Sequence, residues 1–356
     1  MRILIDIGHP GHVHLLKNFT LDMQKEGHEI FFTCRDKEFE IYLLEYYGFN
    51  YISFGKKYKS LWGKIFGLLK FDLQEILTAF KFKPDLFLSA GSMYAAHAAF
   101  FYRKPHFAFE DTFNMEQVKL YLPFTEAVFV SKSGEAPLPP KKMVKYAGFH
   151  ELAYLHPNQF TPDPNIFQDL ELAKDEKYII LRFVSWDASH DIGQSGISMA
   201  YKEEIIKTLS PYAKIFISAE GKLPENLQQY QLKVSPEKIH DVLASATLFI
   251  GEGATMASEC AMLGTPAIYV NSLDALTIQD QEKYGLLFNY RTAENILEKA
   301  LSLMEMDDLN KIFKEKQQKM LSDKIDVTAF LLWFVKHYPE SMQTMHDNPN
   351  YDKRFH

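Results

Sequence analysis

The sequence predicts an α/β fold built from two doubly wound, Rossmann-like domains that face each other across an interdomain cleft. Short apolar runs alternate with segments of helical period, an order that produces parallel sheets with right-handed crossovers. This alternation is interrupted by a proline-rich stretch at residues 159–177 and then restarts. The length of 356 residues also suits two domains. Ligands of such sheets bind at the carboxyl ends of the strands, which places the expected site in the cleft.

The first predicted domain covers residues 1–158 and begins with the strand RILIDI (2–7). The helix after it repeats apolar residues at Val13, Leu16 and Phe19, as a helix packed on a sheet does. Turn residues separate the elements that follow. Strands are expected at 28–35, 51–54, 106–111 and 126–131, a helix at 37–48, and a strand–helix unit at 84–105.

Residues 159–177 are the expected linker, because Pro162 and Pro164 leave little periodicity there. The second domain is expected at 178–338 and restarts with the apolar run YIILRF. Further strands are expected at 214–220, 246–253 and 265–270, with helices at 198–212, 236–246 and 255–264 and closing helices near the end of the domain. The polar residues 339–356 are expected to form a loose tail.

The composition excludes several classes of protein. A formal net charge of −7 gives no reason to expect nucleic acid as a partner. Cys34 and Cys260 alone can form neither a disulfide framework nor a zinc pattern, and they fit a reducing compartment. The N-terminus predicts a strand rather than a signal peptide, and no apolar run is long enough for a transmembrane helix. We therefore expect a cytoplasmic protein.

The segment GEGATMASECAMLGTP (251–266) joins a predicted strand to a predicted helix through a glycine-rich turn. Free N–H groups at the start of such a helix can hold a phosphate. Glu259 lies one turn into the helix, where a carboxylate can accept hydrogen bonds from sugar hydroxyls. A tight turn capped by Thr255 explains the same spacing, so both interpretations are open.

The segment RFVSWDASHDIGQSG (182–196) forms the first strand–loop–helix connection of the second domain. GQSG (193–196) is a second potential phosphate cradle, and His190 beside Asp191 is a candidate acid/base pair. An ordered loop around a core-packing Trp186 is the structural alternative. The candidate ligand-binding residues are Arg182, Ser185, Gly193, Ser195 and Gly196.

Glu110 and Asp111 end a predicted strand of the first domain, where the carboxyl edge of its sheet opens. A carboxylate in this place can deprotonate an acceptor hydroxyl or take part in epimerisation. Capping of the next helix is the structural alternative.

The motifs RFVSWDASHD (182–191) and GATMASECAMLGTP (253–266) resemble those of a prokaryotic family of unknown function within the GT-B superfamily of nucleotide-sugar enzymes. The family motifs run R-x-x-x-W-x-A-S-H-D and G-x-T-M-x-x-E-x-A-x-L-G-T-P. The resemblance extends over roughly residues 1–300. Better-understood relatives are the MurG-like N-acetylglucosaminyltransferases and the UDP-N-acetylglucosamine 2-epimerases. The resemblance implies a GT-B fold and a nucleotide-sugar ligand.

The same resemblance assigns roles to individual residues. It implies a loop for the donor diphosphate, made of Gly253, Ala254, Thr255 and Met256. Glu259 matches the glutamate that binds the nucleotide ribose. Ile239 and His240 correspond to the segment that lines the base pocket. Asp280 and Gln281 correspond to the stretch that contacts the donor sugar.

The first predicted strand ends in GHPGHVH (8–14), which is placed like the G-G-T-G-G-H loop of MurG-like enzymes. Gly8, Gly11 and His12 stand at the corresponding positions. The resemblance makes His12 a candidate base, or a candidate donor to a substrate oxygen. A zinc site on the three histidines is the alternative, and it would need a further ligand.

Residues 55–83 interleave lysines with large apolar residues. Such a basic amphipathic stretch can lie on an anionic membrane surface, at the inner face of which a lipid-linked acceptor would be found. A core-facing helix with solvated lysines is the alternative.

These patterns favour a metal-independent glycosyltransferase of the GT-B type. It would move a sugar from a nucleotide diphosphate donor, expected to be UDP-linked, to a glycan or lipid-linked acceptor in cell-envelope polysaccharide synthesis. No Asp-x-Asp motif argues for a bound metal, and no cofactor is expected besides the nucleotide-sugar substrate. Two alternatives are open, an epimerase-like enzyme or hydrolase acting on the nucleotide sugar, and a nucleotide-sugar-binding protein without turnover. The catalytic candidates are His12, Glu110, Asp111 and His190.

Overall fold

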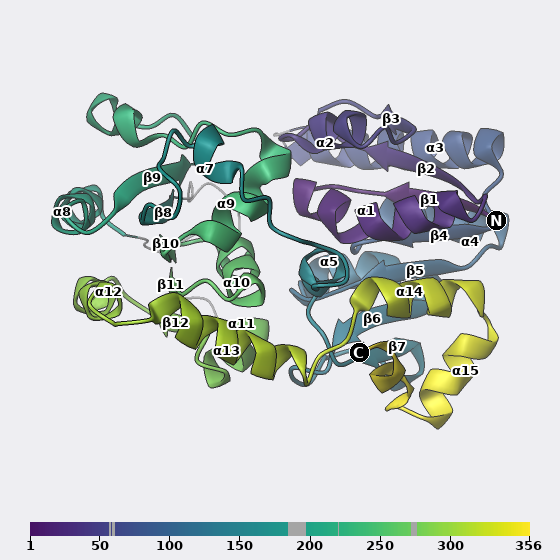
Figure 1. The fold of residues 1–356 in the computed structure, drawn as a ribbon. Coiled ribbons are helices and arrows are strands. Elements are labelled where there is room, and N and C mark those ends of the chain that lie inside the picture. Colours follow the sequence, from purple (N-terminus) through teal and green to yellow (C-terminus); the bar gives the residue numbers. More distant parts are fainter. Residues whose placement is uncertain (57, 59–60, 184–196, 220, 272–275) are drawn as a thin grey trace. The chain divides into compact units, whose positions relative to one another are not determined.

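The computed structural model describes residues 1–356 except 57, 59–60, 184–196, 220 and 272–275. Contacts divide the chain into two units, of which the first is Met1–Gln159 with Lys324–His356 and the second is Phe160–Asp323. Each unit carries a parallel sheet with helices packed on it (Figure 1). The predicted α/β class is therefore confirmed.

The described residues of the first unit form a seven-stranded parallel sheet (the first sheet) in the order β3-β2-β1-β4-β5-β6-β7. Its strands are β1 (Arg2–Asp6), β2 (Glu29–Cys34), β3 (Tyr51–Ser53), β4 (Leu86–Ser89), β5 (His106–Phe109), β6 (Ala127–Ser131) and β7 (Met143–Tyr146). Its helices are α1 (Pro10–Lys25), α2 (Glu40–Tyr46), α3 (Leu61–Phe82), α4 (Met93–Tyr102), α5 (Met115–Tyr121), α6 (Leu152–Leu155), α14 (Val327–Lys336) and α15 (Glu340–Asp347). Helices α3 and α4 cover one face of the sheet, and α1 and α14 cover the other (Figure 1).

The described residues of the second unit form a five-stranded parallel sheet (the second sheet) in the order β12-β11-β10-β8-β9. Its strands are β8 (Tyr178–Phe183), β9 (Lys214–Ala219), β10 (Leu248–Gly251), β11 (Ala267–Val270) and β12 (Leu287–Tyr290). Its helices are α7 (Ile166–Asp169), α8 (Met199–Leu209), α9 (Ile239–Ser245), α10 (Ala254–Leu263), α11 (Leu276–Lys283), α12 (Ile296–Met304) and α13 (Leu309–Leu321). Short 3-10 helices lie at Leu122–Phe124, Pro140–Lys142, Glu225–Tyr230, Pro236–Lys238 and Tyr351–Phe355.

Helix α1 shows how the sequence positions the first loop of the first unit. His9 is its N-cap, and Pro10 follows in the first turn, where a missing N–H costs nothing. The predicted apolar face of the helix, Val13, Leu16 and Phe19, is fully buried. The helix therefore begins inside GHPGHVH, at Pro10, and His12 and His14 lie in its first turns.

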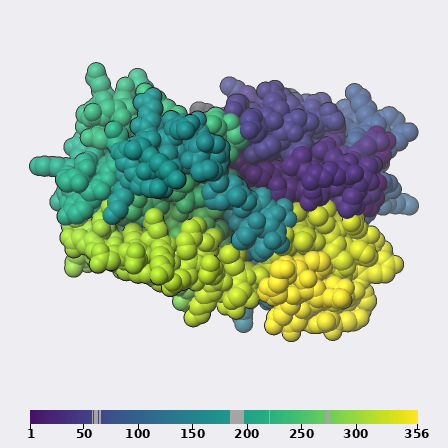
Figure 2. Space-filling view, viewed as in Figure 1, coloured from purple at the N-terminus to yellow at the C-terminus, as the bar shows by residue number. Residues whose placement is uncertain are grey.

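The C-terminal residues correct the expected division of the chain at residue 338. Residues 324–356 pack with the first unit, because the apolar helix α14 needs a buried surface. The ring of Phe334 lies edge-on to the rings of Phe107 and Phe129 in the first sheet, with centroids 5.4 and 5.0 Å away. In Figure 2 this C-terminal segment (yellow) lies beside the N-terminal segment (purple) of the same unit.

The expected loose tail, residues 339–356, is folded. It forms α15, and Asp352 beyond that helix is fully buried. Both carboxylate oxygens of Asp352 accept from Lys132 Nζ, at 2.7 and 2.8 Å, and one also accepts the Ala147 N–H at 2.6 Å. A buried carboxylate needs such partners, so ionic contacts fix the tail, together with the rings of Tyr351 and Phe355, which pack on Trp333.

The proline-rich stretch that was expected to be a linker packs within the second unit from Phe160 onward. Ile166 is buried in α7, and the neighbouring ring of Phe167 lies edge-on to Tyr178 at 6.0 Å. Apolar residues just after the last proline therefore anchor this stretch to the second unit.

Candidate functional site

In each sheet, the strand order reverses direction once. Open α/β sheets bind ligands at such a reversal, outside the carboxyl ends of the strands. In the first sheet this point lies between β1 and β4, where Asp6 pairs with Ser89. In the second sheet it lies between β8 and β10, where Arg182 pairs with Gly251. The motifs singled out in the sequence follow β1, β8 and β10, so they begin at these two points.

The three histidines of GHPGHVH each have a different environment. His9 Nδ1 accepts the Gly11 N–H at 3.1 Å and caps α1. His12 Nδ1 accepts the Gly8 N–H at 3.2 Å, and His14 is buried within the unit. Over the part of the chain that the structure describes, no group of three His, Cys, Asp or Glu side chains is placed to hold a metal ion.

His12 presents a proton donor. Because its Nδ1 accepts a backbone N–H, the proton of the neutral ring sits on Nε2. Burial, together with nearby His9 and Arg35, lowers the pKa of His12 to about 3, against a smaller raising effect of Asp111. The ring is therefore uncharged at neutral pH, and its Nε2–H suits the second expected role, donation to a substrate oxygen.

A buried ion pair lies beside this loop, and the sequence analysis missed it. Arg35, directly after β2, donates to Asp6 at the end of β1. Asp6 also accepts hydrogen bonds from Thr33, at 2.9 Å, and from Ser92. A Cβ on Gly8 would lie 3.0 Å from the Arg35 guanidinium, so glycine allows the loop to approach this cation closely. The pairing register of β1 with β2 brings Asp6 and Arg35 together, and no motif in the local sequence indicates this pair.

Asp111, an expected catalytic carboxylate, pairs with His150, with 3.4 Å between Oδ2 and Nδ1. Desolvation disfavours the charged form of each group, although the Asp111 side chain is 47% exposed, and the attraction within the pair outweighs that cost. Asp111 raises the pKa of His150, while His150 and His12 lower the pKa of Asp111. The ring of Phe109 stands edge-on to His150 at 5.1 Å and fixes its position. His150 was missed because it follows β7, a short strand that the sequence did not reveal.

Glu110 has a positioning role. Its Oε1 accepts the backbone N–H groups of Thr112 and Phe113 at 3.0 and 2.8 Å. Its Oε2 accepts the Tyr121 hydroxyl at 2.5 Å. Both oxygens hold the turn after β5 in place, so Asp111 is the carboxylate of the two that remains for chemistry.

The turn from β10 into α10 has the geometry of an anion site. Gly253 is the N-cap, and among the described residues no side chain caps the helix. Thr255 lies inside the helix, so the expected structural alternative, a Thr255 cap, is wrong. A Cβ on Gly251 would lie 2.7 Å from the Arg182 Cβ, so glycine lets β10 and β8 close at this point. The first N–H groups of α10 are therefore directed to the edge where a ligand would bind.

The expected ribose glutamate and one expected base-pocket residue meet in the structure. Glu259 Oε1 lies 3.1 Å from His240 Nε2, and both side chains are buried. The ring of Phe160 stands edge-on to His240 at 6.2 Å. His240 therefore orients the Glu259 carboxylate, and Ile239, which begins α9, is half-buried beside it in the chain.

Helix α11 carries the two residues expected at the donor sugar. Gln281 is fully buried, and its Nε2 donates to Ser258 Oγ on α10 at 2.5 Å. Within the described residues its Oε1 has no hydrogen-bond partner. Asp280 is partly exposed, with Oδ1 4.0 Å from Lys283 Nζ. Gln281 thus ties α11 to α10.

Arg182, at the end of β8, donates to Ser218 Oγ at 3.0 Å. Beside it, Glu252 accepts the Ile197 N–H at 2.6 Å and lies 3.3 Å from Lys202 Nζ, a buried ion pair that sequence analysis missed. The remaining candidates of this region lie outside the described residues: Ser185, His190, Gly193, Ser195 and Gly196.

Comparisons with known proteins show the family and the fold of the chain. The profile of a family described as "Protein of unknown function (DUF354)" matches residues 1–333. No relative among the curated proteins matches the chain. Many solved structures share the fold at low identity.

Three of these structures illustrate the similarity. The MnaA–UDP complex of S. aureus has a TM-score of 0.66 at 12% identity, with 96% of this chain and 97% of that chain covered. UDP-GlcNAc 2-epimerase from Neisseria meningitidis, bound to UDP-GlcNAc, has a TM-score of 0.62 at 15% identity, covering 89% and 94%. The spinosyn forosaminyltransferase SpnP has a TM-score of 0.63 at 11% identity, covering 96% and 99%. The fold is thus that of GT-B glycosyltransferases and UDP-GlcNAc 2-epimerases.

Proposed function

The chain belongs to the DUF354 family of proteins of unknown function, and we propose that it is an enzyme that binds a nucleotide sugar at the carboxyl edge of the second sheet. The uncapped start of α10, directly after Gly253, carries this proposal, because its N–H groups suit a diphosphate. Structures of similar fold contain UDP or UDP-GlcNAc, which supports a uridine nucleotide as the ligand.

The ligand contacts follow the order of the motifs. Gly253, Ala254, Thr255 and Met256 hold the diphosphate. Glu259, oriented by His240, accepts hydrogen bonds from the ribose hydroxyls. Ile239 borders the base, and Asp280 and Gln281 meet the sugar. Arg182 and the loop residues Ser185, Gly193, Ser195 and Gly196 complete the phosphate contacts.

We propose a glycosyl transfer. The acceptor oxygen bonds to the anomeric carbon, the bond from that carbon to the diphosphate oxygen breaks, and the acceptor proton leaves to a base. Asp111 is that base, held by His150, while neutral His12 donates from Nε2 to a substrate oxygen. The departing diphosphate is stabilised by the start of α10. The acceptor is a glycan or a lipid-linked sugar, as in envelope polysaccharide synthesis.

A second candidate reaction acts on the nucleotide sugar alone. The paired Asp111 and His150 beside the neutral His12 form an acid/base set that also suits epimerisation or hydrolysis. A nucleotide-sugar-binding protein without turnover is the third candidate, and it uses only the second unit.

A thermal-shift screen with the diphosphates of uridine, guanosine, cytidine, adenosine and thymidine tests the binding step. A ligand at a hundred times its Kd stabilises the folded protein by about 2.7 kcal/mol. We expect uridine diphosphate to raise the melting temperature, and no shift with any diphosphate would refute the proposed site.

Incubation with UDP-N-acetylglucosamine and no acceptor then separates the reactions. Glycosyl transfer predicts unchanged donor until an acceptor is added. Conversion of the sugar without an acceptor would replace the transferase by the epimerase or hydrolase, and tight binding with no product under any condition would leave a binding protein.

A further inference from the structure

Helix α3 of the first unit exposes a continuous apolar stripe. Five large side chains recur every three or four residues along one face of the helix, and each is between 51% and 65% exposed: Phe66, Leu69, Leu73, Leu77 and Phe80. The other face of α3 is already buried against the first sheet and α4 through residues such as Phe71 and Ala79. A surface helix normally turns polar side chains to water, so the stripe is a second apolar face that needs a cover.

Within the described part of α3, the exposed charge beside the stripe is basic. Lys81 and, just beyond the helix, Lys83 are exposed. The acids of the described part of α3 turn inward instead, since Glu75 is fully buried and Asp72 binds His97 at 3.0 Å. On the exposed face of the described part of α3, apolar and basic groups therefore lie together without acidic side chains between them.

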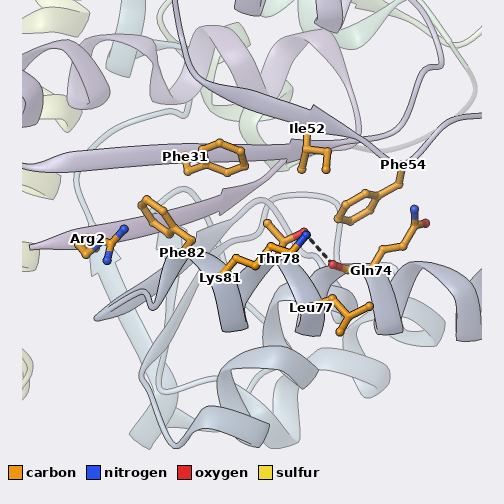
Figure 3. A pocket seen from close by; sticks show the side chains of 9 residues that line it. All are labelled: Arg2, Phe31, Ile52, Phe54, Gln74, Leu77, Thr78, Lys81 and Phe82. Atoms are coloured by element: carbon orange, nitrogen blue, oxygen red, sulfur yellow. Dashed lines mark hydrogen bonds between the residues drawn. The ribbon is translucent and has the colours of Figure 1, made fainter.

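A groove widens this surface toward the edge of the first sheet. It has a volume of about 360 Å³ and lies between α3 and strands β2 and β3. Figure 3 shows Phe31, Ile52 and Phe82 around it, with Leu77 on the helix. Of the two cations that line it, Arg2 pairs with Glu29 at 3.2 Å, and Lys81 brings positive charge to the apolar walls. The stripe is thus continuous, through Leu77, with an apolar hollow that Lys81 borders.

We propose that α3 docks the protein on an anionic lipid bilayer. The helix lies in the plane of the interface, with its apolar stripe at the boundary of headgroups and acyl chains and its lysines on anionic headgroups. Of the described helices, none is long and apolar enough to cross a membrane, so the helix lies on the bilayer. A second copy of this chain is a poorer cover, because pairing two such helices would bring like charges together.

Flotation of the full-length protein with large unilamellar vesicles tests the proposal. We expect binding to equimolar phosphatidylglycerol and phosphatidylcholine at low ionic strength, weakened by added salt. The triple variant Leu69→Ser, Leu73→Ser, Leu77→Ser should lose at least about tenfold in the partition coefficient. The matched control, Tyr46→Ser with Leu120→Ser, removes exposed apolar side chains from α2 and α5 and should bind as the natural protein does.

A second set of variants tests whether binding to the vesicles requires positive charge. Lys81→Glu with Lys83→Glu should lower binding by about tenfold, whereas the control Lys141→Glu with Lys207→Glu should not. Thermal melts and circular dichroism show whether every variant is folded, and neither depends on lipid or on a nucleotide, so failure here is distinct from failure of the proposed function. Absence of vesicle binding at low salt overturns the proposal, as does equal binding to pure phosphatidylcholine. A solution dimer that the triple leucine variant abolishes also overturns it, because the stripe would then cover a second copy.

Discussion

At the scale of single residues, the Asp111–His150 pair makes the stability of the first unit depend on pH. The raised pKa of His150 contributes stability that is complete below its ordinary value of about 6.5 and is lost as pH rises through the folded-state value. The lowered pKa of Asp111 contributes stability that is complete above about 3.8 and is lost as pH falls. Asp111→Asn should therefore cost most between about pH 4 and 6.5.

Urea unfolding of the natural protein and of Asp111→Asn across this pH range measures the difference. Asp307→Asn, an exposed change in the second unit, is the control and should give a flat profile. A difference that grows above pH 8 would contradict the assignment. In the same variant, catalytic turnover should fall by about a hundredfold or more if Asp111 is the base.

The buried pair of Arg35 and Asp6 predicts a larger effect on stability. Arg35→Met leaves the Asp6 carboxylate buried with only hydroxyl donors, from Thr33 and Ser92. Loss of one partner of a buried ion pair costs about 3–5 kcal/mol. Urea denaturation should show this loss, and Asp6→Asn in the same chain should recover part of it.

Arg2→Met is the matched control for Arg35→Met. Arg2 pairs with Glu29 at 3.2 Å, but the two side chains are 38% and 66% exposed, so the change should cost less than about 1 kcal/mol. Equal losses of unfolding free energy in Arg35→Met and Arg2→Met would show that the buried Asp6–Arg35 pair stabilises the unit no more than the Arg2–Glu29 pair does.

At the scale of elements, the start of α10 offers a change with opposite effects on stability and binding. Gly253→Asp supplies the missing side-chain cap at a residue with φ −94°, which any residue adopts. It should stabilise the free protein by about 0.5 kcal/mol. The same carboxylate repels a diphosphate, so affinity for uridine diphosphate should fall by at least about tenfold.

Thermal melts and titration calorimetry measure the two effects of Gly253→Asp. Gly253→Asn, which caps without charge, separates capping from repulsion and should lose less affinity. Unchanged affinity in the aspartate variant would show that the diphosphate binds elsewhere.

Elements also show what the sequence could reveal. Strands with continuous apolar runs, such as β1 and β10, were predicted because full burial leaves that pattern. Strands β7 and β12 were missed, because MVKY and LFNY carry polar residues and leave a weak pattern. Glycine-rich turns before helices predicted where backbone N–H groups could contact a ligand. Arg35, His150 and Lys202 were missed, because only the sheet register and the crossovers bring them to the strand ends.

At the scale of the whole molecule, local sequence patterns could not predict which unit the C-terminal residues join. The apolar periodicity of α14 predicts a helix but does not indicate which sheet the helix packs on. Its partners, Phe107 and Phe129, lie about two hundred residues earlier in the chain, and the contact is settled by aromatic packing. The first unit therefore needs both ends of the chain, whereas the second unit is built from one continuous segment.

This organisation predicts that the C-terminal residues stabilise the first unit alone. Asp352→Ala would leave Lys132 Nζ and the Ala147 N–H without their shared carboxylate. Loss of a buried, charged acceptor should lower the free energy of unfolding of the first unit by about 2–3 kcal/mol. Each unit has its own core, so affinity for uridine diphosphate in the second unit should stay within about twofold of the natural value.

Unfolding followed by hydrogen exchange, with calorimetric titration of uridine diphosphate, reads the two units separately. Amides of β6 and β7 should exchange faster in Asp352→Ala, while those of β10 should not. Asp347→Ala, in the exposed end of α15, is the control and should leave both units unchanged. Faster exchange in β10, or loss of nucleotide affinity together with the first unit, would show that the units do not fold as separate bodies. Unaltered exchange throughout would show that the buried carboxylate of Asp352 does not hold the C-terminal segment in place.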